Sequence, residues 1–167
     1  MLIRILTEDD LDAVWALRLR ALKDNPEAFG STYEETLAHG NEWMRQRLRA
    51  PENETFYLGV FEENLIGIVA CFREDASKTR HKGYVVSMYV APESRGLGAG
   101  KALMQALIDR ARQIEGIEQL HLAVVTTNSV AYQLYRSLGF EVYGTEPRAL
   151  KSGGDYWDEH LMVLNLL

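Results

Sequence analysis

The sequence has a single cysteine and no long apolar run. Cys71 has no partner within the chain, so an intramolecular disulfide is excluded. No stretch of about 18 apolar residues occurs, which excludes a membrane-spanning helix. The first six residues, Met1 to Leu6, lack the long apolar region and cleavage site of a signal peptide. We therefore expect a cytoplasmic protein that does not use a membrane.

Metal ligands and basic charge are also scarce. The histidines and Cys71 show no spacing typical of a metal motif, so we expect no metal site. The 18 Lys and Arg residues against 24 Asp and Glu residues leave a net charge of −6. A protein that binds nucleic acid through its phosphates usually carries a basic excess. The charge balance therefore disfavours nucleic acid as a partner.

An ordinary globular composition is what remains. The chain has 167 residues, of which 47% are hydrophobic and 25% are charged. A chain of this length buries roughly 70% of the surface that its unfolded form exposes, enough for a core without disulfide or metal. No linker, repeat or low-complexity segment interrupts it, so we expect one domain over residues 1–167.

Hydrophobic periodicity predicts alternating strands and helices. The apolar stripe of the first helix, expected at 11–23, includes one arginine, Arg18. The order β-α-α-β-β-β-α-β-α-β-β predicts a mixed α/β fold with a central sheet and helices on both faces. Strands are expected at 2–6, 55–61, 65–72, 84–90, 120–125, 140–145 and 156–166, and helices at 11–23, 32–49, 98–113 and 131–138. A loop with Gly153 and Gly154 separates the last two strands.

A glycine-rich loop joins the central strand to the following helix. It reads Arg95-Gly-Leu-Gly-Ala-Gly-Lys101. Glycines let backbone amides approach a ligand closely, and the helix N-terminus adds positive potential, so the loop is typical of a phosphate cradle. A P-loop would need Gly at 95 and Ser or Thr at 102, and the dinucleotide fingerprint also fails. The alternative is a tight turn that only caps the helix.

Two motifs together resemble a known family. Met88-Tyr-Val precedes Arg95-x-x-Gly-x-Gly, and Asn128-x-x-Ala-x-x-Leu-Tyr-x-x-x-Gly-Phe follows later. In this order and spacing they resemble the GCN5-related N-acetyltransferase superfamily. The specific motifs lie within about residues 84–140, while the strand and helix order agrees along the whole chain.

The resemblance implies acetyl-coenzyme A as cofactor. It also implies six or seven mostly antiparallel strands, with the fourth strand splayed from the fifth so that its backbone can pair with the pantetheine arm. The glycine loop would hold the pyrophosphate, and Asn128 would bind the pantetheine, cap its helix, or both. The implied cofactor residues are Met88, Tyr89, Val90, Arg95, Gly96, Leu97, Gly98, Ala99, Gly100, Lys101, Asn128 and Tyr135.

Tyr135 is the catalytic acid that the resemblance implies. A phenol with a pKa of about 10 stays protonated at neutral pH and can donate to a thiolate whose own pKa is roughly 8.5. The position of Tyr135 in the apolar stripe of its helix would by itself favour core packing, and it is the family motif that favours the catalytic role.

The family's two positions for an acidic general base hold Tyr84 and Ala123 here, so a carboxylate base is absent at these places. Some relatives that acetylate protein N-termini place a tyrosine at the first position. This suggests a relay of Tyr84, a water and His121, whereas the alternatives are a purely structural His121 or no base at all.

The acceptor site is expected between the loop 26–35 and the hairpin 149–159. Phe29 and Tyr33 would form an apolar wall, and Glu34 or Asp155 would attract an ammonium group. Acids outnumber bases in these segments, which favours a cationic amine over an anionic acceptor. The expected function is acetyl transfer to a primary amine of a small molecule. The alternatives are acetyl transfer to a peptide N-terminus or to a lysine, and a non-catalytic coenzyme A-binding module. The sequence does not fix the oligomeric state, and a homodimer is one option.

Overall fold

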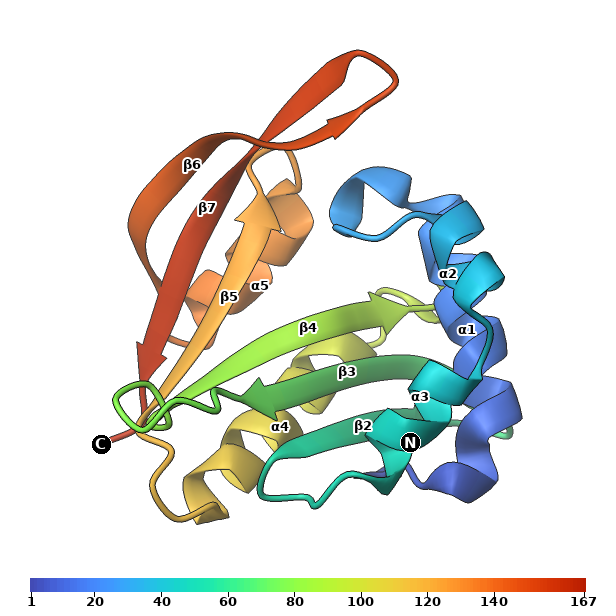
Figure 1. Cartoon of the computed structure of the whole chain (residues 1–167), viewed down its shortest axis with the longest axis horizontal. Coiled ribbons are helices and arrows are strands. Elements are labelled where there is room, and N and C mark those ends of the chain that lie inside the picture. The colour runs from blue at the N-terminus through green and yellow to red at the C-terminus, as the bar shows by residue number, and fades with distance from the viewer.

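The computed structural model describes residues 1–167 and contains one seven-stranded sheet of order β1-β2-β3-β4-β5-β7-β6 (Figure 1). Its strands are β1 (Leu2–Ile5), β2 (Thr55–Phe61), β3 (Leu65–Arg73), β4 (Lys82–Val90), β5 (Gln119–Val125), β6 (Glu141–Ser152) and β7 (Asp155–Asn165). The α-helices are α1 (Leu11–Asp24), α2 (Tyr33–His39), α3 (Glu42–Arg49), α4 (Ala99–Gln113) and α5 (Ser129–Ser137). Short 3-10 turns occupy Glu8–Asp10, Pro26–Ala28 and Pro92–Ser94.

Helices cover both faces of this sheet, as predicted. α4 and α1 both pack on β3 but contribute to two separate hydrophobic clusters. The larger cluster has 22 buried residues and includes the apolar face of α4, whereas the smaller has 11 and includes that of α1. Burial of aliphatic side chains on both sides of the central strands is the main favourable term for such a layered arrangement.

The β4–β5 pair is the only parallel pair of the sheet, and it is short. Only Lys82–Tyr84 of β4 pairs with β5, opposite Gln119–His121. Beyond this point β5 turns away with β7 and β6, so the two halves of the sheet open like a V (Figure 1). The splay between strands four and five is therefore confirmed.

Two predicted elements differ from the structure. The prediction of one helix over residues 32–49 is wrong: α2 ends and α3 begins around Gly40, whose φ of +74° is left-handed and cannot continue a helix. The strand predicted at 140–145 is longer than expected, because β6 runs over Glu141–Ser152 and meets β7 at a tight turn. Gly153 and Gly154 occupy this turn with φ of +58° and +87°, the conformation that two-residue hairpins require.

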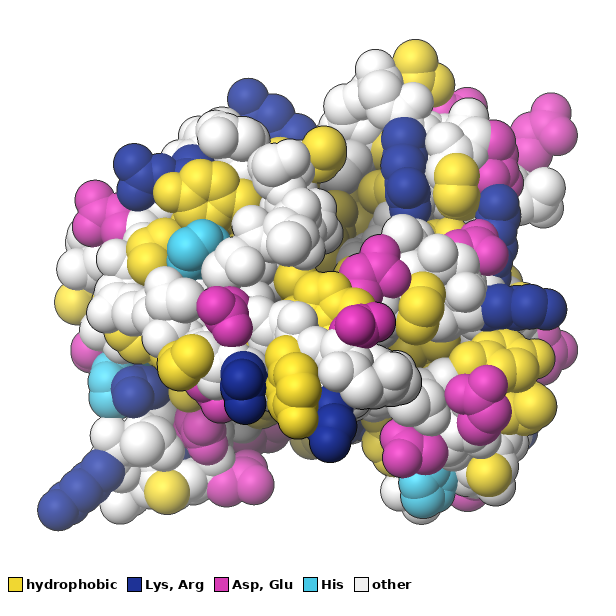
Figure 2. All heavy atoms as spheres, turned by 90° about the horizontal axis from the view of Figure 1, so that it is seen from above, with side chains coloured by type: hydrophobic (Ala, Val, Ile, Leu, Met, Phe, Trp, Pro, Cys, Tyr) yellow, Lys and Arg dark blue, Asp and Glu magenta, His cyan; other side chains and the backbone are white.

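Charged side chains are scattered over the upper face of the molecule. Figure 2 shows acidic and basic groups interspersed on this face, without one large basic patch. None of the helices combines the length and the hydropathy needed to cross a lipid bilayer.

Candidate active site

A cleft of about 970 Å³ fills the opening between β4 and β5. Its walls come from α1, the loop after α1, β4, the glycine loop, β5, α5 and β7. The edge of β4 beyond Tyr84 has no strand partner on this side. The Ala91 amide donates to Ile66 in β3, so the polar groups of Val90 point to the other edge, toward the cleft. An extended ligand can therefore pair with β4 here.

β4 also carries a bulge beside the cleft. Ser87 has a φ of +60°, and the register with β3 shifts between Ile68 and Ala70. A bulge adds one residue and changes which face the following side chains occupy. As a result, Met88 packs with the α4 cluster while Tyr89 belongs to the α1 cluster.

The glycine loop forms one end of the cleft. Gly96 and Gly98 both have φ of +82°, and a Cβ atom added to either would meet no atom within 4 Å. The loop therefore presents open space next to backbone groups at the start of α4, which fits a pyrophosphate. Lys101 lines the cleft, whereas Leu97 is 69% exposed and does not. All other predicted cofactor residues line the cleft.

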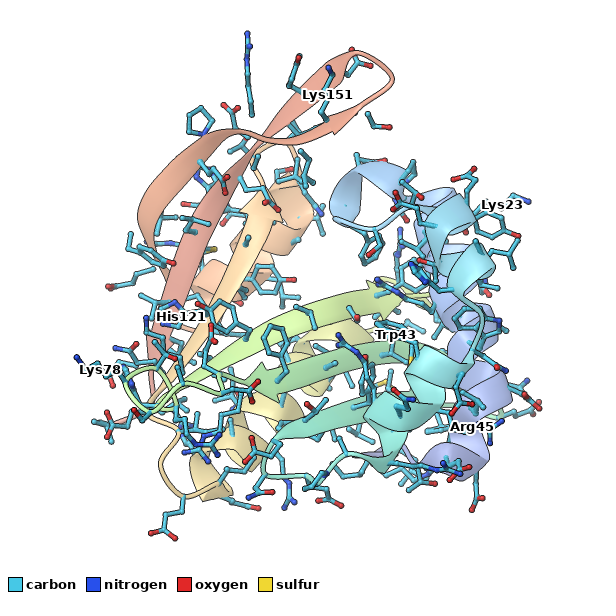
Figure 3. All side chains as sticks on the ribbon, in the orientation of Figure 1. Lys23, Trp43, Arg45, Lys78, His121 and Lys151 are labelled. Carbon is cyan, nitrogen blue, oxygen red and sulfur yellow. The ribbon has the colours of Figure 1, made fainter.

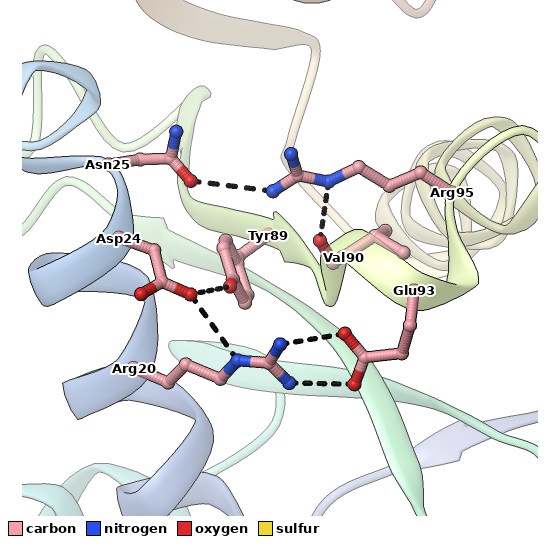
Figure 4. A network of polar contacts seen from close by, with 7 residues as sticks. All are labelled: Arg20, Asp24, Asn25, Tyr89, Val90, Glu93 and Arg95. Carbon is pink, nitrogen blue, oxygen red and sulfur yellow. Dashed lines mark hydrogen bonds and ion pairs between the residues drawn. The ribbon is translucent and has the colours of Figure 1, made fainter.

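Arg95 is tethered rather than free. Its Nε donates to the Val90 carbonyl at 2.8 Å, and Nη2 donates to Asn25 Oδ1 at 3.4 Å (Figure 4). Its guanidinium also lies over the Tyr89 ring, 5.4 Å from the centroid. These contacts join the start of the glycine loop to the end of β4 and to the loop after α1.

A second set of contacts in Figure 4 joins α1 to the same region. Arg20 makes two hydrogen bonds of 2.7 Å to Glu93 and one of 3.3 Å to Asp24, which also accepts from the Tyr89 hydroxyl at 3.4 Å. The Arg20 guanidinium lowers the pKa of the Glu93 carboxyl to about 2. The carboxylate is thus ionised throughout the neutral range, and α1 stays connected to the loop after β4.

Tyr135 reaches the cleft from α5. It is 7% exposed, lies edge-on to Phe140 at 6.0 Å between centroids, and lines the cleft. Burial raises its pKa to about 12. Asn128 begins α5, and its Oδ1 accepts from the Ala131 amide at 3.2 Å. Its side-chain NH₂ group donates to no protein atom and is available to a ligand in the cleft.

Tyr84 and His121 lie where the two halves of the sheet meet (Figure 3 labels His121). Their rings stack at 5.5 Å, and Tyr143 meets His121 edge-on at 5.7 Å. Tyr84 lines the cleft, but His121 does not. His121 Nε2 contacts Gln119 Oε1 at 3.0 Å, and its buried Nδ1 has no partner. Tyr84 and His121 are thus neighbours in ring contact, and a relay through them stays a prediction.

Burial of His121 makes the stability of the protein depend on pH. Desolvation is the main cause that lowers its pKa below the ordinary 6.5, and Lys82 and His81 add to it. The unfolded chain then binds more protons than the folded one, so stability falls as pH drops from about 6.5 toward the lowered folded value. We expect His121→Gln to lose less unfolding free energy than the parent between about pH 7.5 and about pH 5.5 in urea titrations. An equal loss of unfolding free energy on acidification in both proteins would contradict this.

The predicted acceptor residues are only partly brought together. Phe29 lines the cleft, whereas Tyr33, Glu34 and Asp155 do not. Tyr33 instead lies 5.9 Å from the Lys23 ammonium group. Their roles toward an acceptor stay predictions.

The cleft holds two acids, Glu27 and Glu159. Glu159, on β7, was one of several acids expected near the acceptor. Burial, and then the neighbouring Glu146, raise the pKa of its carboxyl. A half-buried carboxylate of raised pKa inside a cleft is a candidate for contacting an amine or its proton.

Sequence reasoning missed Arg18 as a cleft residue. Its place in the apolar stripe of α1 was visible, but the stripe alone indicates only core packing. In the structure it lines the cleft, is 7% exposed, and lies 5.1 Å from the Phe29 ring. An arginine within a helix's apolar stripe was the signal that could have identified it.

Comparison with known proteins assigns the family. The profile of the Acetyltransferase (GNAT) family matches residues 17–140. The chain is 40% identical over 80 residues to the L-methionine sulfoximine/L-methionine sulfone acetyltransferase of Pseudomonas aeruginosa, a match that covers 48% of this chain and 46% of that protein. It is 30% identical to the catalytic subunit NAA10 of the N-terminal acetyltransferase A complex of Arabidopsis thaliana, over 93% of this chain and 74% of that protein.

A solved structure shows the same fold. The phosphinothricin acetyltransferase of Sinorhizobium meliloti, determined in complex with acetyl-coenzyme A, superposes with a TM-score of 0.83 at 24% identity, covering 98% of this chain and 87% of that one. The chain spans about half the length of the first curated relatives that it matches. The profile match covers most of the chain, including β4, the glycine loop, α5 and Tyr135. The chain belongs to the acetyltransferase (GNAT) family.

Proposed function

We propose that the protein is an acetyl-coenzyme A-dependent N-acetyltransferase that moves an acetyl group from the thioester directly to a primary amine of a small molecule. One observation carries this proposal: the unpaired edge of β4, the glycine loop and Tyr135 all border the same cleft. The named relative from Pseudomonas, which acetylates small molecules, and the Sinorhizobium structure support the same class of acceptor.

The chain's own residues fit the cofactor and the transfer. The backbone of Val90 and its neighbours would pair with the pantetheine arm, and the amides at the start of α4 would hold the pyrophosphate. Bound acetyl-coenzyme A would supply the activated thioester. Tyr135 Oη would hold the proton that the departing thiolate needs, and its pKa of about 12 keeps that proton in place over the whole neutral range.

Glu159 and the Tyr84–His121 pair are the candidates for lowering the cost of deprotonating the amine. An amine of pKa about 10.4 is neutral only about 0.1% of the time near pH 7.4, which costs roughly 4 kcal/mol. A carboxylate at Glu159 would orient the ammonium group and accept its proton. Burial in the cleft also favours the neutral amine.

Acetylation of a peptide N-terminus is the second candidate function. Tyr84 lines the cleft and lies in ring contact with His121, the pair that the resemblance associates with N-terminal acetylation. The similarity to the Arabidopsis catalytic subunit points the same way.

An acceptor screen separates these functions. The protein is incubated with acetyl-coenzyme A and, in turn, small primary amines, peptides with a free N-terminus, and N-blocked peptides that contain lysine, while release of free thiol is recorded. We expect small primary amines to give the highest kcat/KM. A preference for free peptide N-termini would favour the second candidate. Cofactor binding without thiol release from any acceptor would indicate a non-catalytic module.

The relay prediction is tested with the best acceptor. If Tyr84 and His121 pass the amine proton through a water, Tyr84→Phe and His121→Ala should both lose kcat/KM most at low pH, where the amine is most protonated. Tyr143→Phe is the matched control, because Tyr143 contacts His121 but does not line the cleft. Unchanged pH profiles in both variants would remove the relay and leave Glu159 as the base to test.

A further inference from the structure

Arg18 places an unpaired positive charge in the wall of the cleft. Its side chain comes from the buried stripe of α1, between the fully buried Val14 and Ala21 one turn to either side. Nevertheless it lines the cleft, with its guanidinium over the Phe29 ring. Arg18, which is only 7% exposed, therefore borders the space where an acceptor is expected.

No group of the protein neutralises this charge. None of the ion pairs in the structure involves Arg18, its side chain donates no hydrogen bond, and its Nε is buried without a partner. Neither cleft acid, Glu27 or Glu159, lies within ion-pair distance of it. Apart from burial, the groups that influence the pKa of Arg18 are the Tyr57 hydroxyl, itself buried without a partner, and another cation, Arg47.

Such an arrangement is costly unless a ligand completes it. Burial lowers the pKa of Arg18, but a guanidinium starts from above 12 and stays charged in proteins. A buried charge without a counter-ion carries a desolvation penalty that stacking on one aromatic ring offsets only in part. The protein retains this cost at a position that faces the cleft, which is where a bound anion would offset it.

The anion is assigned to the acceptor rather than to the cofactor. The phosphate-binding features belong to the loop after β4, which has its own cations in Arg95 and Lys101. Arg18 comes from α1 and packs on Phe29, the cleft residue predicted to contact the acceptor. A guanidinium is a planar fork of donors that matches a carboxylate in two-point contact.

We propose that Arg18 binds a carboxylate of the acceptor, so that the substrates are carboxylate-bearing primary amines of the amino-acid class. The inference rests on the proposed function and names the substrate class for the same site. Glu159, on β7, would face the ammonium group, and Arg18, on α1, the carboxylate. A purely cationic amine would leave Arg18 unpaired and bind less tightly.

Kinetics with paired acceptors tests the inference. Each L-amino acid of a panel is assayed beside the amine that lacks its carboxylate and beside its amide. We expect the parent to prefer the amino acid about 10–100-fold in kcat/KM, the usual worth of a charged hydrogen-bonded contact. Arg18→Met should abolish the preference mainly through KM, and Arg18→Lys should keep part of it. A parent without preference, or Arg18→Met that retains it, would overturn the inference.

A binding measurement keeps the inference testable if turnover is slow. Melting temperatures are recorded with coenzyme A alone and with coenzyme A plus N-acetyl-L-amino acids as product-like carboxylates. We expect the N-acetyl-L-amino acid to raise the melting temperature further in the parent but not in Arg18→Met. Arg47→Met is the control and should behave like the parent, because the Arg47 side chain stacks on Trp43 outside the cleft. If Arg18→Met does not fold, Arg18→Lys is compared instead.

The two proposals fail in different ways. If coenzyme A does not raise the melting temperature of the parent or of any variant, the proposed function is wrong. Suppose instead that coenzyme A raises the melting temperature of every variant. An N-acetyl-L-amino acid that then adds the same further rise in the parent and in the Arg18 variant would remove only the role of Arg18.

Discussion

Replacing Tyr135 by Phe should lower kcat about 10–1,000-fold while changing acetyl-coenzyme A binding little. The phenylalanine ring keeps the edge-on contact with Phe140 and the packing of α5, so the fold should be preserved. Only the hydroxyl proton is lost. The parent phenol has a pKa of about 12, so it remains a donor at every pH at which the assay is run. The kcat is measured by thiol release and the cofactor Kd by calorimetry.

Tyr132→Phe is the matched control for Tyr135→Phe. Tyr132 lies on the same helix, contacts His160 and does not line the cleft, so loss of its hydroxyl should leave kcat near that of the parent. Turnover at the parental rate in Tyr135→Phe would mean that Tyr135 only fills the core, and that another group supplies the proton.

Replacing Gly98 by Val should abolish the stabilisation that acetyl-coenzyme A confers. At a cofactor concentration of about 100 times Kd, the parent should gain about 2.7 kcal/mol, or about 5–10 °C in melting temperature. Gly98 begins α4 with a φ of +82°, which a β-branched residue does not tolerate, so the loop must change conformation. The amides that would face the pyrophosphate then no longer converge. Thermal melts with and without cofactor measure the effect.

Gly154→Val separates cofactor loss from general strain. Gly154 has a φ of +87° and, like Gly98, open space around an added Cβ, but it lies in the β6–β7 turn away from the glycine loop. This variant should lose intrinsic stability and keep the cofactor shift. NAD and ATP should stabilise the parent much less than acetyl-coenzyme A, and equal protection by NAD would contradict the cofactor assignment.

Local sequence patterns were sufficient for most of the elements. The hairpin of β2 and β3, the glycine loop before α4 and the Asn128 cap of α5 depend on residues adjacent in the chain, so their signals are visible in the sequence. The division of α2 from α3 was missed because hydrophobic periodicity continues past Gly40. The conformation of that one glycine ends the helix.

Sequence alone determined the layered α/β organisation, the phosphate-type loop and the family resemblance, because periodicity and short motifs record which face of each element is buried and where the backbone must bend. Tertiary structure alone decided which side chains share the cleft. Glu159, from β7, lines the cleft with Arg18, from α1, whereas Glu34 and Asp155 lie outside it. The physical reason is that β4 and β5 separate after Tyr84. The direction in which the two halves of the sheet diverge selects the side chains that face the opening. That direction depends on the packing of elements far apart in the sequence.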